Sequence, residues 1–529
     1  MNEKLEYLKN RVAERKMSRR EFVGRAGALG VSAAAAGTMF ANAAQAAGPV
    51  MGGTLKVGLS GGASSDTLDP ALVASEATHG ILRCWSDHLV NVSATGEVVP
   101  RLAEEVSSSP DAKVWSFKIR KGVQFHNGKT MTPEDVVATI ERHTGDDAKS
   151  GAQGIVKGIA SMAINGDTVE ITLSQANADF PYLMADYHLA IQPNGGKDDP
   201  AAGIGTGAYI VESNEPGVRT VFKKNPNDWD PDRGYADAVE VLVINDATAR
   251  TSALQSGQVH MINRVDPKVA GLLDRAPNLS VKNVSGRGHY VFIMRIETDE
   301  FTNPHLRMAL KLAINRQEMV DKILRGYGGV GNDFPINAAY PLFDDTIPQR
   351  EYDPEAAAEH YKLSGHDGSP IILRTADAAF PGAVEAAQLF QESAKAAGIP
   401  LEVKREPDDG YWSEVWNVKP FCASYWSGRP TQDQMYSTAY LSTAEWNDTQ
   451  WKRPEFDAML IAAKAELDPV KRKELYSKMA RMLRDEGGLI LPMFNDFVDA
   501  VSNKVGGYED DPNGELMDHF AMQRCWLES

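Results

Sequence analysis

Cysteine and long apolar runs are both scarce in this chain. Only 3 of its 529 residues are cysteines. Cys84, Cys422 and Cys525 lack the paired spacing of a zinc site or of a disulfide framework, so we expect three partly buried small side chains. No run approaches the 18 or so consecutive apolar residues that a membrane-spanning helix needs. The sequence therefore predicts neither a disulfide-stabilised scaffold nor a membrane span.

Basic charge is also in short supply. Lysine and arginine number 55 against 72 aspartates and glutamates, which gives a net charge of −17. This acidic balance argues against nucleic acid and against an anionic membrane surface as partners. With 43% hydrophobic and 24% charged residues, the chain has the composition of a folded protein. Its length predicts two or three domains.

Sequence motifs of catalysis are largely missing. There is no phosphate-binding loop, dinucleotide fingerprint or H-E-x-x-H segment. Gly58-Leu59-Ser60-Gly61-Gly62 matches the G-x-S-x-G elbow of serine hydrolases and follows a predicted strand. The elbow needs an apolar helix after it, whereas residues 66–70 are turn-rich. We therefore reject a serine hydrolase, and we expect no enzyme, no catalytic residue, no cofactor and no metal site.

The N-terminal segment has the parts of an export signal in the right order. The pair Arg19-Arg20 precedes a weakly apolar stretch over residues 26–40, and residues 44–46 form a small-x-small cleavage site. The consecutive arginines resemble the twin-arginine signal. The alternative is a short amphipathic helix with a chance pair of arginines.

Cleavage near Ala46/Ala47 would remove residues 1–46, which carry 8 basic and 4 acidic side chains. The acidic character therefore belongs to the remaining chain, which we expect in the periplasm.

Strands and helices of both types alternate along that chain. Alternating apolar residues predict strands at 53–59, 115–119 and 169–173. Beyond about residue 300 the pattern becomes rich in helices, several of which start at an Asn-Pro or Asp-Pro pair. There we predict helices from 303, 315, 353, 382 and 468, and strands at 370–374, 401–403 and 489–494. This order favours an α/β fold.

Several segments in a fixed order resemble the solute-binding proteins of the dipeptide, oligopeptide and nickel class, which are family 5 of the extracellular solute-binding proteins of ABC importers. The matching segments are Gly52-Gly53-Thr54-Leu55, Leu68-Asp69-Pro70, Pro100-Arg101-Leu102-Ala103-Glu104, the stretch from Trp115 to Gly128, Thr132-Pro133-Glu134-Asp135-Val136-Val137, Gly205-Thr206-Gly207-Ala208-Tyr209, Leu254-Gln255-Ser256-Gly257 and Asn303-Pro304-His305-Leu306-Arg307-Met308-Ala309-Leu310.

The resemblance implies an α/β, two-lobed, hinged periplasmic-binding-protein fold with an extra inserted domain. Ligand would lie between the lobes. The implied divisions are a signal peptide at 1–46, lobe I at 47–77, 203–293 and 493–529, the extra domain at 78–202, and lobe II at 294–492.

The resemblance also locates a candidate ligand site, with one departure. Peptide binders of this class place an aspartate just after a Gly-Trp pair to hold the ligand's ammonium group. The matching region is 421–430, where Trp426 is kept and Arg429 falls at or near the aspartate position. A guanidinium suits a carboxylate or phosphate instead. Tyr425 and Ser427 flank the tryptophan and complete this part of the candidate site.

Two other cleft-lining segments of the resemblance carry Arg264 and Arg295, and Asp186 and Glu76 match positions near the pocket of peptide binders. The three arginines suggest a ligand with an anionic group, and the two acids could hold a cationic end. The alternative is that each arginine pairs with a carboxylate of the protein.

The aromatic side chains of the same stretch either pack lobe II or form a wall on which a ligand stacks. We expect packing for Trp412 and the wall for Trp426. The aromatic residues in question are Tyr411, Trp412, Trp416, Tyr425 and Trp426.

The function that the sequence favours is the substrate-binding subunit of an ABC importer. It would capture a peptide or another small, anion-bearing solute and deliver it to a permease in the inner membrane, and we expect a monomer. Two alternatives of the same fold stay open: a receptor that reports ligand occupancy to a membrane sensor, and a binder of a metal chelate or haem.

Overall fold

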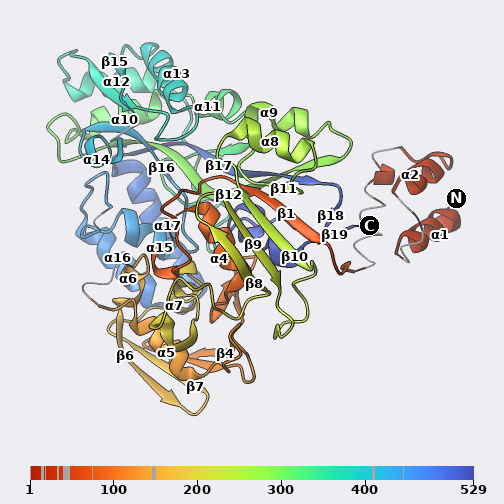
Figure 1. The fold of residues 1–529 in the computed structure, drawn as a ribbon. Coiled ribbons are helices and arrows are strands. Elements are labelled where there is room, and N and C mark those ends of the chain that lie inside the picture. The colour runs from red at the N-terminus through yellow and green to blue at the C-terminus, as the bar shows by residue number, and fades with distance from the viewer. Residues whose placement is uncertain are drawn as a thin grey trace.

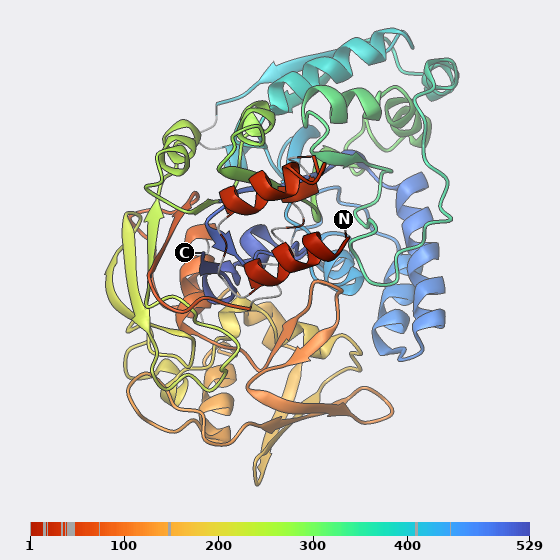
Figure 2. The same cartoon turned by 90° about the vertical axis from the view of Figure 1, so that its right-hand side faces the viewer.

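The computed structural model describes residues 2–13, 17, 19–32, 35–37, 39, 48–73, 75–145, 150–407, 411–444 and 446–528. Separate hydrophobic clusters divide the body of the molecule into lobe I, an extra domain and lobe II. In both views the extra domain lies at one end of the molecule, and helices α12 (Pro354–Ser364) and α13 (Ala383–Lys395) of lobe II lie at the other (Figures 1 and 2). The predicted two-lobed α/β fold with an inserted domain is confirmed.

Lobe I is built on the first predicted strand, whose Leu55, Val57 and Leu59 are fully buried. This strand pairs in parallel with the neighbours on both of its sides, so its apolar side chains form the centre of the core. The elements of lobe I are β1 (Thr54–Leu59), η1 (Pro70–Leu72), α4 (Glu76–Trp85), β8 (Tyr209–Glu215), β9 (Arg219–Lys224), β10 (Ala238–Val243), α8 (Ala247–Gln255), β11 (Met261–Ile262), α9 (Pro267–Leu273), β18 (Val505–Gly506), α18 (Glu515–Asp518), α19 (Ala521–Arg524) and β19 (Trp526–Leu527).

The extra domain contains a four-stranded antiparallel sheet in the order β4-β5-β7-β6. Trp115, Phe117 and Ile119 alternate into its core as predicted. Its elements are β2 (Val90–Val92), β3 (Val98–Pro100), β4 (Ala103–Ser108), β5 (Val114–Ile119), α5 (Pro133–Glu141), α6 (Gln153–Val156), β6 (Ile159–Asn165), β7 (Thr168–Leu173), α7 (Phe180–Leu183), η2 (Tyr187–Leu189) and η3 (Pro193–Gly196).

Lobe II is rich in helices, several of which start as the sequence predicts. The side chains of Asn303, Asp353 and Asp468 each accept a backbone N–H of the helix that they precede, which satisfies a donor that the first turn leaves open. Its elements are α10 (Pro304–Leu312), α11 (Arg316–Lys322), β13 (Gly328–Val330), α12 (Pro354–Ser364), β14 (Ile371–Thr375), α13 (Ala383–Lys395), β15 (Leu401–Arg405), α14 (Tyr411–Glu414), β16 (Phe421–Trp426), α15 (Gln432–Ala439), α16 (Pro454–Ala465) and α17 (Pro469–Glu486).

Two long strands, β12 (Leu279–Met294) and β17 (Leu489–Ser502), run from lobe I into lobe II (Figure 1). They pair with each other along their length, with a register shift between Ser285 and His289. On the lobe I side β17 pairs with β11, and on the lobe II side β12 pairs with β16. The resulting sheet order is β15-β14-β16-β12-β17-β11-β1-β10-β9-β8. A break in register between two packed cores is where we expect the hinge.

These cores place the divisions somewhat differently from the boundaries that the resemblance implies. The boundary between residues 77 and 78 falls inside α4, whose buried side chains belong to the lobe I core, so the extra domain begins after α4. The boundaries at 293/294 and 492/493 fall inside β12 and β17. In these strands the lobe II core extends from Val291 to Met294 and from Leu489 to Phe494.

The helices α1 (Asn2–Ala13) and α2 (Arg19–Gly27) form a separate small cluster around Phe22. The expected cleavage site at 44–46 lies outside the described residues. Across the described ranges, no helix has both the length and the apolar character needed to span a membrane. The three cysteines are buried and form no disulfide with one another.

Candidate functional site

The three parts of the molecule are in contact around the region between the lobes. Asp179 of the extra domain pairs with Arg472 of lobe II at 2.6 Å. Arg287, at the register shift of β12, donates from Nη1 to Oδ1 of Asn513 at 2.7 Å, and Nδ2 of Asn513 donates to the carbonyl of Ser93 at 2.9 Å. These contacts therefore connect the extra domain to both lobes in this region.

A network of charged side chains lines lobe I at this region. Nε of Arg264 donates to Oε1 of Glu515 at 2.6 Å, and its guanidinium also lies 3.4 Å from Glu76. The other oxygen of Glu76 is 3.0 Å from Nε2 of His519, and the other oxygen of Glu515 accepts from Asn263 at 2.7 Å. The predicted residues Glu76 and Arg264 are therefore brought together, and both are engaged by partners within lobe I.

Local structure sets the positions of these two residues. Glu76 is the first residue of α4, where Ser75 caps the helix and a carboxylate meets the positive helix end. Arg264 is the second residue after β11 and has a φ of +49°, a conformation that costs a bulky side chain about 1 kcal/mol or more. Arg250 donates to the Arg264 carbonyl at 2.9 Å. These contacts hold Arg264 in a backbone geometry that it would not otherwise favour.

The charges in this network act strongly on one another. Burial alone would raise the pKa of Glu76, but the hydrogen bond and charge of His519, together with Arg264, lower it to about 2. Burial alone would lower the pKa of His519, but Glu76 and the other carboxylates nearby raise it. His79 behaves oppositely: burial, followed by the charges of His519 and Arg83, holds its pKa well below the ordinary range. At neutral pH, His79 is therefore a neutral imidazole.

Tyr187 links this network to lobe II. Its ring lies 4.3 Å from that of His79. Burial raises the pKa of its hydroxyl, the charges of Asp186 and Glu76 raise it further, and Arg429 of lobe II opposes them. A residue of the extra domain thus faces charged groups from both lobes.

On the lobe II side, Tyr425 and Arg429 face the same region. Tyr425 has 46% of its surface exposed and lies close enough to Arg264 for their charges to interact. The backbone N–H of Arg429 donates to the Tyr340 hydroxyl at 3.1 Å, and its Nη1 donates to the carbonyl of Gly428 at 2.6 Å. Among the described residues, no carboxylate forms an ion pair with Arg429.

Trp426 is buried, in contrast to the expected stacking wall. Only 5% of it is exposed, and it belongs to the lobe II core. Its indole N–H donates to Oδ2 of Asp448 at 3.3 Å, an oxygen that also accepts from Trp416 at 3.1 Å. The Arg429 guanidinium lies over the Trp426 ring, 5.7 Å from its centroid. The Trp426 ring therefore packs against the Arg429 guanidinium. In this conformation Tyr425 is the exposed aromatic side chain of β16.

The other predicted site residues are more dispersed. Asp186 is close to the cleft but is engaged with His188, at 2.7 Å from Nδ1. Ser427 is exposed in the turn after β16. Arg295 follows the end of β12 that is remote from the cleft, where its guanidinium pairs with Glu297 at 2.5 Å. Arg295 therefore follows the alternative interpretation, in which an arginine pairs with a carboxylate of the protein.

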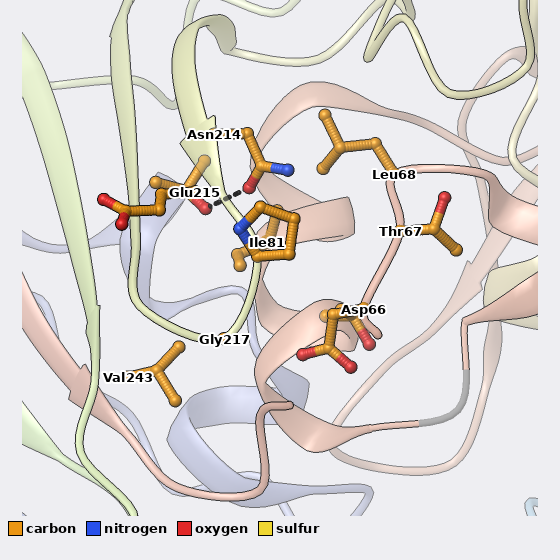
Figure 3. Close-up of a pocket in the computed structure, with 11 residues that line it drawn as sticks. Asp66, Thr67, Leu68, Ile81, Asn214, Glu215, Gly217 and Val243 are labelled. Atoms are coloured by element: carbon orange, nitrogen blue, oxygen red, sulfur yellow. Dashed lines mark hydrogen bonds between the residues drawn. The ribbon is translucent and has the colours of Figure 1, made fainter. Parts of the chain in front are cut away.

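Of the remaining aromatic residues, Tyr411 is buried and donates its hydroxyl to the carbonyl of Ala423 at 2.9 Å. Trp416 packs against the lobe II core, and the side chain of Trp412 lies outside the described residues. One hollow within lobe I, lined by residues such as Asp66 and Asn214 (Figure 3), holds no more than about one water molecule.

Sequence reasoning missed Glu515, His519 and His79, as well as Tyr187 and Arg287. The first two come from the last turns of the chain and meet partners that lie 251 and 443 residues earlier. His79 follows Glu76 at helical spacing, which was the only local signal. Among the described residues, Glu76, His79 and His519 are the one group of three whose ligand atoms could hold a metal ion.

Comparison with known proteins identifies the family of this chain. The model of bacterial extracellular solute-binding proteins, family 5 middle region, matches residues 97–448, more than half of the chain. Di/tripeptide-binding protein 1 of Pseudomonas aeruginosa is 26% identical over 428 residues, which cover 74% of this chain and 79% of that protein. A glutathione-binding protein of Salmonella choleraesuis is 25% identical over 468 residues, 84% of this chain and 90% of that protein.

Among solved structures, the fold is similar to that of DppA from Helicobacter pylori, an ABC transporter-associated periplasmic binding protein in complex with the peptide STSA. The TM-score is 0.76 at 23% sequence identity, and the alignment covers 91% of this chain and 99% of DppA. The family match confirms the resemblance that the sequence motifs indicated, and the structural likeness confirms the fold class.

Proposed function

This chain belongs to the family 5 bacterial extracellular solute-binding proteins of ABC importers, and from this premise we propose that it captures a small solute bearing a carboxylate or similar anion in the cleft between its lobes. The family is one of solute-binding proteins, which confirms the prediction that the chain is not an enzyme. The names of two relatives, a di/tripeptide-binding and a glutathione-binding protein, support peptides or peptide-like molecules as the solute class.

The observation that carries this proposal is the state of Arg429. It faces the cleft from lobe II, rests over Trp426 and has only a backbone carbonyl as an acceptor among the described residues. A guanidinium in a partly desolvated cleft gains from a carboxylate, because two parallel N–H donors match its two oxygens. A ligand ammonium at the same position would meet a like charge instead.

Capture would use the hinge. A solute that contacts Tyr425 and Arg429 of lobe II together with Arg264 of lobe I favours the closed arrangement, because only that arrangement offers all of these contacts at once. The closed protein would then deliver its solute to a permease of the inner membrane. We further propose export by the twin-arginine route to the periplasm, supported by the Arg19-Arg20 pair at the start of α2, and action as a monomer.

The test starts from the natural solute. Mass spectrometry of the molecule released on denaturing natively purified protein identifies it, and calorimetry then compares its free carboxylate with the corresponding amide. We expect the amide to bind roughly 30-fold more weakly or worse, because a buried charged hydrogen bond is worth about 2–5 kcal/mol. An amide that binds within a factor of two of the acid would contradict the proposal.

A further inference from the structure

Three side chains of lobe I that could ligate a metal ion converge beside the cleft. Glu76 and His79 are three residues apart in α4, so both project from the same face of its first turns. His519 approaches them from the C-terminal segment, just beyond α18. One carboxylate oxygen of Glu76 and one ring nitrogen of each histidine lie within 4.8 Å of one another.

Two ring nitrogens in this group have unused hydrogen-bonding capacity. Nε2 of His79 and Nδ1 of His519 are buried and have no hydrogen-bond partner, and His519 as a whole is 1% exposed. Nδ1 of His519 faces α4 at Gly80, the residue after His79. Buried polar atoms without partners cost about 1–3 kcal/mol each in folded proteins, and an ion is one of the few things that satisfies them.

The charges around the group also permit a cation. Glu76, Glu515 and Asp518 act on His519, while Arg264 and Arg83 are engaged by Glu515 at 2.6 Å and by Asp518 at 3.1 Å. Each of the two guanidiniums therefore already has a carboxylate partner. A divalent ion that takes the place of the His519 proton would meet the same carboxylates that favour that proton.

We propose that Glu76, His79 and His519 form a three-ligand site for a divalent transition-metal ion of the Zn²⁺, Co²⁺ or Ni²⁺ kind. Two imidazoles and one carboxylate are the donor set that such ions accept, and three protein ligands leave a fourth position open. About a third of the Glu76 side chain is exposed, so the group is accessible from solvent on the Glu76 side. This site goes beyond the proposed anion capture, because its occupation requires no solute.

The experiment titrates chelator-treated, untagged protein with Co²⁺ alone and with Zn²⁺ alone, without solute, by calorimetry and by the visible spectrum of Co²⁺. We expect one ion per chain and an absorption band typical of a four-coordinate Co²⁺ site. His79→Gln and His519→Gln should each weaken binding by at least about tenfold, since even changes to the second shell of a metal site cost 10- to 100-fold.

The matched control is His360→Gln. His360 and His305 of lobe II approach to 3.0 Å between their Nδ1 atoms, so they are a second pair of neighbouring histidines at which an adventitious ion could bind, and removal of that pair should leave the titration unchanged. His519 is buried and its replacement could disturb folding, so His79→Gln decides the matter. Full binding by His79→Gln, absence of binding by the wild type, or loss of binding only in His360→Gln would each overturn the proposal. None of these results would touch the anion preference of Arg429.

Discussion

Arg264 and Arg429 belong to opposite lobes, and the protein holds them in different ways. Arg264 is bound by two carboxylates of its own lobe, at 2.6 Å from Glu515 and 3.4 Å from Glu76. Arg429 rests on the Trp426 ring and donates to a backbone carbonyl. The charge of Arg264 is thus largely neutralised before any solute arrives, whereas that of Arg429 is not. We therefore expect these two identical side chains to contribute differently to the proposed binding of an anionic solute.

The residues that position Arg429 also differ from those that position Arg264. Asp448 is fully buried and holds both Trp416 and Trp426 through their indole N–H groups. A carboxylate therefore lies near Arg429 as well, but the Trp426 indole separates Asp448 from the guanidinium. This arrangement holds the guanidinium through the ring and one backbone carbonyl and pairs it with no carboxylate among the described residues, which is what a site for an anionic group requires.

The largest expected effect separates the two arginines directly. Arg429→Gln should weaken binding of the carboxylate-bearing solute by roughly 30-fold or more, because a desolvated charged contact is lost. Arg264→Gln should weaken it by less than about fivefold, because a half-exposed and already paired guanidinium has little to offer. Calorimetry of both variants with the same solute measures the difference.

Arg453→Gln is the matched control for that experiment. Arg453 also lies over an indole of lobe II, 5.6 Å from the Trp451 centroid, and pairs with Glu486. Its replacement should not change the affinity. A greater loss in Arg264→Gln than in Arg429→Gln would reverse the assignment and move the anion contact to lobe I.

The second prediction tests the support beneath Arg429. Burial raises the pKa of Asp448 from 3.8 to about 7, although the two indole hydrogen bonds oppose it. The folded state therefore binds this proton more tightly than the unfolded state, so Asp448 costs stability progressively as the pH rises from about 4 to about 7, and the cost is constant above that. Asp448→Asn removes the titration and keeps the shape of the side chain.

Relative to wild type, Asp448→Asn should gain about 3 kcal/mol between pH 4.5 and pH 8, because most of the pKa rise from 3.8 to about 7 falls in this range and each unit is worth about 1.4 kcal/mol. Weaker hydrogen bonds to the indoles lower the stability of the variant by a similar amount at every pH and leave this slope unchanged. Thermal unfolding across this pH range measures the difference. Asp377→Asn, at a half-exposed carboxylate paired with Arg405, should run parallel to wild type. Parallel profiles for Asp448→Asn as well would show that Asp448 is ionised in the fold throughout.

The sequence predicts the elements of this fold better than it predicts the hinge. The strand predicted at 489–494 continues to Ser502, because β17 leaves the lobe II core at Asn495 and Asp496 and then enters lobe I. In β12 the segment Gly286-Arg287-Gly288 interrupts the apolar alternation that marks a strand. A side chain at Gly286 would place its Cβ 2.3 Å from the Phe497 ring. Pairing between distant segments, which no local pattern encodes, holds both strands together.

The site shows the same limit. Glu76, Arg264, Tyr425 and Arg429 could be proposed from their alignment with a family, but their partners could not. Glu515 and His519 lie in a C-terminal segment without a motif, and only the folding of lobe I brings them to the residues after β11 and to α4. Whether a cleft arginine is available to a solute depends on such partners, and this is why Arg264 and Arg429 looked alike in the sequence.

The smallest expected effect comes from releasing Arg264. Glu515→Gln keeps the length of the side chain and the acceptor for Asn263, but it removes the charge that binds the Arg264 guanidinium. A released guanidinium should then attract the anionic solute, and we expect its affinity to rise about two- to fivefold, the range of a partly exposed ion pair of up to about 1 kcal/mol. Because the gain is electrostatic and near the surface, it should shrink between low and high salt.

Glu240→Gln is the control. Glu240 holds two cations of lobe I, Lys56 at 3.1 Å and Arg219 at 2.6 Å, and its loss should leave the affinity unchanged. An unchanged or weaker affinity in Glu515→Gln would mean that Arg264 is oriented by its backbone and by Glu76, and that Glu515 does not withhold it from the solute.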